Sequence, residues 1–162
     1  MSNKTENVPH GTAKSGAKQN PEIRLLEEVY KNTKMGSDAI LSLLPKVEDG
    51  AFRQDLTCQL TGYQGYALDA ARLLLDRGQT PEELTVFKRI PAQIGIEMNT
   101  AFDKSTSKLS ELMINGSTMG IIDMRRALRE ASDASCAQDV ADLGNTVIRF
   151  EENNVEKLKT YL

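Results

Sequence analysis

Apolar side chains recur every three or four residues along most of the chain, the spacing that places them on one face of an α-helix. Four such stripes, separated by capping or helix-breaking residues, predict helices over 22–44, 51–77, 105–130 and 134–161. No segment alternates apolar and polar residues as a half-buried strand does. The sequence therefore predicts an all-α fold.

Local signals mark several helix ends. The tripeptide Asn20-Pro21-Glu22 combines an N-cap, a proline at the first helical position and an acidic residue at the positive end of the helix dipole. We also expect Ser132-Asp133 to cap the fourth helix. Gly78 is expected to end the second helix in a left-handed conformation.

The region between the second and third helices is less regular. Thr80-Pro81-Glu82-Glu83 has the spacing of a capping box and predicts a short helix over 81–89, with a second piece over 91–102 after a proline. One continuous helix over 91–130 is the alternative. Short links within the first and second pairs of helices favour an antiparallel four-helix bundle, which the segment 80–102 crosses between the pairs.

Residues 1–20 contain almost no large apolar side chains and bury too little surface to offset the entropy of ordering. We therefore expect a disordered polar tail, followed by a bundle domain over 21–162. The net charge of the chain is −3, and because the tail is basic, the bundle domain is the more acidic part. This balance argues against binding of nucleic acid.

No stretch approaches the roughly 18 consecutive apolar residues of a membrane span, and the N-terminus lacks the apolar core of a signal peptide. We expect no membrane span and a cytoplasmic protein. Cys58 and Cys136 lie far apart in the sequence and are interpreted as buried, reduced thiols. A disulfide or a metal-binding role is the alternative.

The only histidine, His10, lies in the predicted tail. The bundle domain therefore has no imidazole for acid–base catalysis, phosphotransfer or metal binding. We expect no enzymatic activity, no cofactor and no metal.

Glycine occurs repeatedly inside the predicted helices, where each residue costs roughly 1 kcal/mol relative to alanine. In an antiparallel bundle these glycines fall near one mid-height layer, and they are Gly36, Gly62, Gly65, Gly116, Gly120 and Gly144. Close helix packing, a small ligand pocket or hinge, and outward contacts with a second subunit are the three interpretations. The pocket would be lined by Thr33, Tyr63, Tyr66, Ser117 and Asn145.

The segments Tyr30–Gly36, Gly116–Asp123 and Glu151–Leu158, together with the predicted helix order, resemble small uncharacterised bacterial ferritin-like proteins. The resemblance implies a ferritin-like fold over residues 21–162. Ferritin-like metal sites use Glu-x-x-His motifs, and this chain has none. An all-carboxylate metal site would have to be assembled from Glu28, Glu111, Glu151 and Glu152.

The sequence thus predicts a non-catalytic helical-bundle scaffold or interaction protein. Residues 84–102 are rich in large apolar side chains, so a homodimer or a protein partner is expected to use them. A small-ligand-binding bundle is the alternative, and an all-carboxylate metalloprotein is the third hypothesis.

Overall fold

The computed structural model describes residues 20–82 and 103–162. Four α-helices occupy these ranges, namely α1 (Pro21–Leu43), α2 (Gly50–Asp76), α4 (Thr106–Asp133) and α5 (Gln138–Lys159). One 3-10 turn, η1 (Leu44–Lys46), follows α1. These ranges contain no strand, which confirms the all-α prediction. The predicted tail and most of the predicted helices at 81–89 and 91–102 lie outside the described residues.

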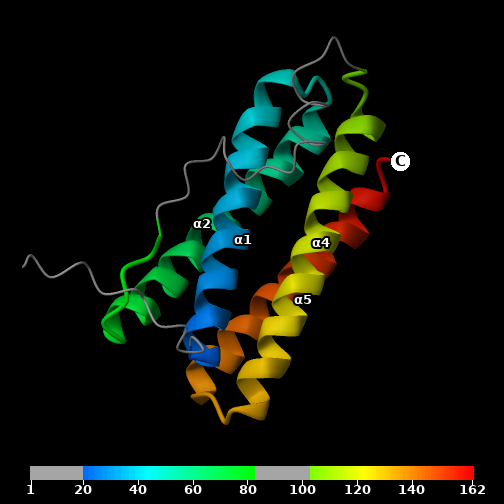
Figure 1. Cartoon of the computed structure of the whole chain (residues 1–162). Helices are drawn as coiled ribbons and strands as arrows, with labels where there is room; N and C mark the ends of the chain where they lie inside the picture. Colours follow the sequence, from blue (N-terminus) through cyan, green and yellow to red (C-terminus); the bar gives the residue numbers. More distant parts are fainter. Residues whose placement is uncertain (1–19, 83–102) are drawn as a thin grey trace, which may run out of the picture.

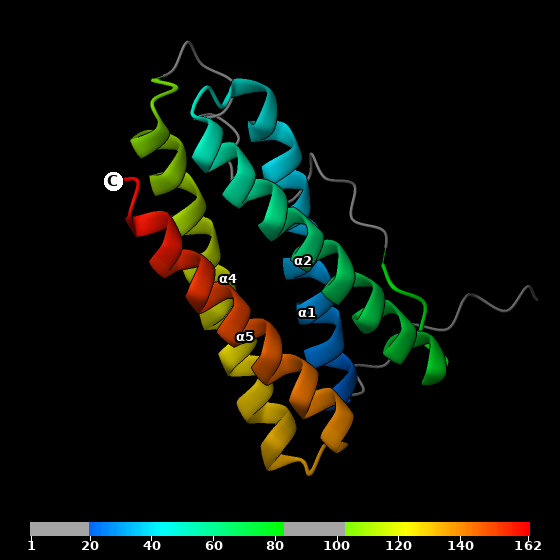
Figure 2. The same ribbon diagram turned by 180° about the vertical axis from the view of Figure 1, so that it is seen from behind.

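The helices form a bundle made of two hairpins. The chain turns back between α1 and α2, and again between α4 and α5 (Figures 1 and 2). Most contacts of α1 are with α2 and α4, whereas most contacts of α4 are with α5. The two hairpins are therefore joined chiefly through α1 and α4.

Most of the predicted helix ends are found in the structure. Side-chain oxygens of Asn20, Asp49 and Ser105 accept hydrogen bonds from backbone N–H groups in the first turns of α1, α2 and α4. Gly78 has a φ of 69° just after α2, which confirms the predicted left-handed end. Residues 103–105 are not helical, so the alternative of one helix over 91–130 is wrong.

The start of α5 differs from the prediction. Ser132-Asp133 form the end of α4 and do not cap α5, whose N-cap residue is Ala137. The backbone N–H of Ala137 instead donates to the Glu22 carboxylate of α1 at 3.2 Å. Asp139, in the first turn of α5, also accepts a hydrogen bond from the Val140 N–H at 2.9 Å. The start of α5 is therefore held by one distant and one local carboxylate.

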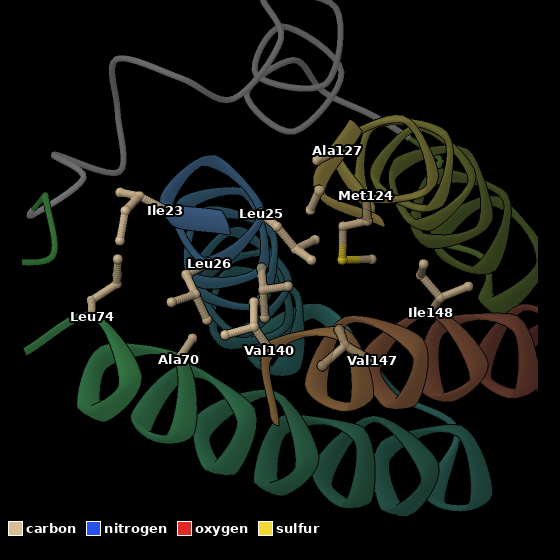
Figure 3. Packing of buried hydrophobic residues seen from close by; sticks show 12 residues of the cluster. Ile23, Leu25, Leu26, Ala70, Leu74, Met124, Ala127, Val140, Val147 and Ile148 are labelled. Carbon is tan, nitrogen blue, oxygen red and sulfur yellow. The ribbon is translucent and has the colours of Figure 1, made fainter. Parts of the chain in front are cut away.

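Two clusters of buried apolar side chains fill the bundle. The first lies toward the start of α1, and Figure 3 shows its side chains converging from all four helices. Its labelled members are Ile23, Leu25, Leu26, Ala70, Leu74, Met124, Ala127, Val140, Val147 and Ile148. The second lies toward the other end and contains Ile40, Leu43, Val47, Phe52, Leu56, Tyr63, Leu109, Met113 and Leu158.

The buried face of α4 is the predicted one in part. The helical spacing of apolar residues predicts one stripe that includes Leu109, Leu112 and Met113, which are buried. Met119 and Ile122 belong to the same predicted stripe, but each is 53% exposed. Ser110 and Ser117 are buried instead, and the Ser110 hydroxyl donates to the Leu158 carbonyl oxygen at 2.6 Å. Small hydroxyl residues are buried here because their polar groups have partners across the bundle.

Cys58 is exposed and Cys136 is partly buried in the link between α4 and α5, so neither is the fully buried thiol that was expected. Both thiols are free. Among the helices of the described ranges, none has the length and apolar character needed to cross a membrane.

Candidate functional site

A carboxyl group is buried between the two apolar clusters. Glu151 of α5 is 1% exposed. Its Oε2 accepts a hydrogen bond from the Tyr63 hydroxyl of α2 at 2.7 Å, and its Oε1 accepts one from Asn32 Nδ2 of α1 at 3.0 Å. The Ser117 Oγ of α4 lies 3.3 Å from the Tyr63 hydroxyl. Each helix thus contributes one member of a mid-bundle polar cluster, consisting of Asn32, Tyr63, Ser117 and Glu151.

The cluster favours protonated side chains. Burial raises the pKa of Glu151, although hydrogen bonds from Ser117, Tyr63 and Asn32 partly offset this effect. Burial, together with the nearby Glu151 charge, also raises the pKa of Tyr63 well above its usual value. Burying a charged group away from water is costly, so the uncharged, protonated forms of Glu151 and Tyr63 are favoured.

Two glycines make room for the polar cluster. A Cβ at Gly36 would lie 2.5 Å from Tyr63 Cε1, so the tyrosine ring packs directly on the α1 backbone. A Cβ at Gly120 would lie 2.1 Å from the Asn32 side-chain oxygen. Larger residues at either position would displace a side chain that bonds to Glu151.

Phe150 closes one side of the cluster. Its ring meets the rings of Tyr63 and Tyr66 edge-on, with centroids 5.0 and 5.1 Å away. A Cβ at Gly62 would lie 2.5 Å from Phe150 Cε2, so this glycine allows the ring to approach α2. The space at mid-height beside these glycines is therefore occupied by aromatic rings.

The other helical glycines have different surroundings. A Cβ at Gly144 would meet Leu25 Cδ1 at 3.3 Å, within the first apolar cluster. Gly65 and Gly116 face open space, so close helix packing, one of the three interpretations of the glycines, does not apply to them.

The structure brings together only part of the predicted pocket. Tyr63 and Ser117 lie in the polar cluster, and Tyr66 is partly buried beside it. The buried Thr33 hydroxyl donates to carbonyl oxygens of its own helix. Asn145 is exposed and bonds to its own helix, so it lies apart from the others.

Sequence reasoning missed Asn32 and treated Glu151 only as a candidate metal ligand. The available signal was the position of Glu151 within the stripe formed by Val147, Asn154 and Leu158, all of which are buried. A charged residue on the buried face of a helix indicates a polar partner inside the fold. The identity of that partner depends on how the helices are aligned.

The four carboxylates considered for a metal site do not converge. Glu28, Glu111 and Glu152 each pair with a lysine or arginine, whereas Glu151 is buried in the polar cluster. Within residues 20–82 and 103–162, no group of three or more histidine, cysteine, aspartate or glutamate side chains is arranged to hold a metal ion.

An ionic contact joins the end of α2 to the starts of α1 and α5, at one end of the bundle. Arg77, just after α2, pairs with Glu22 in the first turn of α1. It also donates to both carboxylate oxygens of Asp139 in the first turn of α5, each at 3.1 Å. Each charge is favourable at its helix end, because acidic groups stabilise N-termini and basic groups stabilise C-termini.

The described site is therefore a buried polar cluster between two apolar clusters, and the ionic contact around Arg77 joins three helices at one end of the bundle.

In comparisons with known proteins, the chain matches no family model, no curated protein and no solved structure.

Proposed function

We propose that this protein is a non-catalytic helical-bundle scaffold that acts by binding protein, in the first instance a second copy of itself. The occupied mid-bundle layer carries this proposal. The Tyr63 ring fills the space over Gly36, and the Tyr63 hydroxyl bonds to Glu151. The polar groups at mid-height are thus directed toward one another, which suits a structural role better than recognition of a substrate.

Burial of the acidic groups supports the non-catalytic assignment. Glu151 and Tyr63 are the buried groups whose pKa values are raised most clearly by desolvation, and each is 1% exposed. A catalytic acid or base must come within hydrogen-bond distance of a substrate. A group enclosed by the bundle meets this requirement only if the helices separate.

We further propose that the fold is an antiparallel, ferritin-like bundle of bacterial type located in the cytoplasm. The two helix hairpins support the topology (Figure 1). The free thiols of Cys58 and Cys136 are compatible with a reducing compartment. At mid-height, where ferritin-like proteins hold metal, this bundle places the polar cluster around Glu151.

A candidate contact surface lies on α4. Met119 and Ile122 are each 53% exposed, and the adjacent Gly116 has open space over its backbone. Apolar side chains beside a small residue allow another helix to approach closely, and their burial favours association. The segment 84–102, proposed for the same role, lies outside the described residues.

Sedimentation velocity over a concentration series tests this assignment. We expect the wild-type chain to form a dimer and the Met119→Lys/Ile122→Lys variant to be monomeric. The matched control is Leu68→Lys/Leu75→Lys, because Leu68 and Leu75 are 73% and 59% exposed on α2. The control should remain dimeric. Equal masses for all three proteins would show that α4 is not the contact surface.

A small-ligand-binding bundle is the second candidate, and a buried amide favours it. Both polar atoms of the Gln59 side chain have no hydrogen-bond partner within the described part of the chain. An unpaired buried amide costs about 1–3 kcal/mol, so a bound neutral molecule with both donors and acceptors would stabilise it. Such a ligand would add a stoichiometric mass to the folded chain that is lost in Gln59→Leu.

A further inference from the structure

The hydrogen bonds around Tyr63 can run in two directions. The Tyr63 hydroxyl lies 2.7 Å from Glu151 Oε2 and 3.3 Å from Ser117 Oγ. It has one hydrogen to donate, and its oxygen also accepts. An ionised Glu151 draws that hydrogen to itself. A protonated Glu151 can donate to the tyrosine oxygen, which leaves the tyrosine hydrogen free to turn to Ser117.

The surroundings do not supply a positive charge to an ionised Glu151. From α1 it faces the Asn32 amide, and from α2 it faces the Tyr63 hydroxyl. From α4 come Ser117 and the Met124 thioether, which lies 3.5 Å from Asn32 Nδ2. Tyr63 is the only titratable side chain among these described neighbours.

The charged residues adjacent to the cluster in sequence pair elsewhere. Lys31, which precedes Asn32, pairs with Glu28 on α1. Glu152, which follows Glu151, pairs with Arg125 on α4, and both side chains are at least 40% exposed. Neither pair involves Glu151, so its ionised form is stabilised by hydrogen bonds alone, and a positive charge from solution is what would neutralise it.

A proton meets this need with the least change in structure. It occupies no additional volume, in a layer where the Tyr63 ring already packs on Gly36. A metal ion would require several more oxygen ligands around it than the existing hydrogen bonds leave free. Burial raises the pKa of Glu151, which acts in the same direction.

We propose that Glu151 is an internal proton-binding site and that Tyr63 changes its hydrogen-bond acceptor when the site is filled. On uptake of a proton from solvent at Oε2, the new O–H donates to the tyrosine oxygen, and the tyrosine O–H turns to Ser117. On release of the proton to solvent, the tyrosine O–H turns back to the carboxylate. The neutral form holds the four helices together most tightly, and ionisation weakens their contact at mid-height.

The direction of the pH dependence follows from the raised pKa. The stabilising contribution of Glu151 is fully present below the pKa of an unfolded glutamate, about 4.3. It is lost as the pH rises through the higher pKa of the folded state. This inference concerns the interior of the bundle and does not depend on which partner the surface binds.

Denaturant unfolding over a pH series tests the proposal on the full chain. Relative to Glu151→Gln, the folded-to-unfolded ratio of the wild-type protein should fall by up to about tenfold per pH unit between those two pKa values. Glu152→Gln is the matched control, because it removes the adjacent but exposed carboxylate. This control should keep the wild-type pH dependence. Parallel profiles for wild type and Glu151→Gln would overturn the proposal.

Infrared difference spectroscopy detects the proton itself. A carboxylic-acid band should persist in the wild-type protein at a pH where exposed carboxyl groups are ionised, and it should vanish in Glu151→Gln. Tyr63→Phe removes a donor to the ionised form, so the band should persist to higher pH. A wild-type protein without this band contradicts proton binding, as does a band unaffected by Glu151→Gln.

Exchange of sodium for potassium or a bulky organic cation at constant ionic strength distinguishes binding of a proton from binding of a metal ion at Glu151. We expect the pH profile to stay the same. A stability that depends on the identity of the cation, and that loses this dependence in Glu151→Gln, would overturn the proton in favour of a metal ion.

Discussion

The Tyr63 ring packs on the backbone of Gly36, so that a Cβ at position 36 would lie 2.5 Å from Tyr63 Cε1. The ring has little freedom to move away, because its hydroxyl bonds to Glu151 and its edge meets Phe150. Close packing of α1 and α2 at mid-height therefore depends on a missing side chain.

Gly36→Ala is predicted to destabilise the protein. Overpacking costs about 1–3 kcal/mol, which outweighs the roughly 1 kcal/mol that alanine gains over glycine within a helix. Gly65→Ala on α2 is the matched control, because nothing lies within 4 Å of a Cβ at that position and it is outside the proposed α4 contact surface. The control should be stabilised by up to about 1 kcal/mol. Chemical denaturation measures both, and effects of the same sign would contradict the close contact at Gly36.

Arg77→Gln is predicted to lower the free energy of unfolding by about 1–2 kcal/mol at low salt. The variant removes the ionic contact with Glu22 and Asp139, in which the Arg77 and Glu22 side chains are only about one-fifth exposed. The loss should shrink as salt screens the charges. Arg126→Gln serves as the control, since its pair with Asp123 is 3.6 Å long and well exposed, and it should have little effect.

Tyr161 is predicted to ionise late in an alkaline titration. Its hydroxyl donates to the Asp55 carboxylate, which raises the pKa of Tyr161 to about 12. The stabilisation from this group is therefore present below about pH 10 and lost as the pH rises through about 12. Tyr63 also holds its proton to high pH, so Tyr161→Phe should reduce the late change in ultraviolet absorbance by about one tyrosine without abolishing it. Asp55→Asn should move that transition to lower pH.

Asn20→Ala is predicted to lower the free energy of unfolding by roughly 0.5–2 kcal/mol, because the Asn20 side chain accepts a hydrogen bond from the Glu22 N–H at 3.0 Å. Chemical denaturation measures this loss.

Deletion of residues 1–19 should leave the melting temperature unchanged, because that segment contains almost no large apolar side chains. A clear loss of melting temperature in the truncated chain would show that the segment packs against the bundle.

Features encoded by adjacent residues were predictable from the sequence. Asn20 at the start of α1 and Gly78 after α2 act within one helical turn, so each leaves a complete signal in a short window. The start of α5 was not predictable in this way. The N–H of its N-cap residue, Ala137, donates to Glu22, which is far away in the sequence and belongs to another helix.

The buried polar residues were harder to predict because their partners lie on other helices. Ser110 and Ser117 interrupt the apolar stripe of α4, while the large side chains of Met119 and Ile122 lie on its exposed side. Size and hydrophobicity alone correctly predict burial of Leu109, Leu112 and Met113, but they wrongly predict burial of Met119 and Ile122. The serines are buried because hydroxyl and carbonyl groups meet them, and those contacts depend on the alignment of helices that a single sequence does not specify.

Native mass spectrometry of the full chain, purified without chelator or affinity tag, tests most directly whether this bundle has a closed interior and acts through its surface. We predict the mass of a dimer of bare chains. Stoichiometric iron or manganese, or a retained small molecule lost in Gln59→Leu, would contradict this account and make the interior of the bundle the functional site.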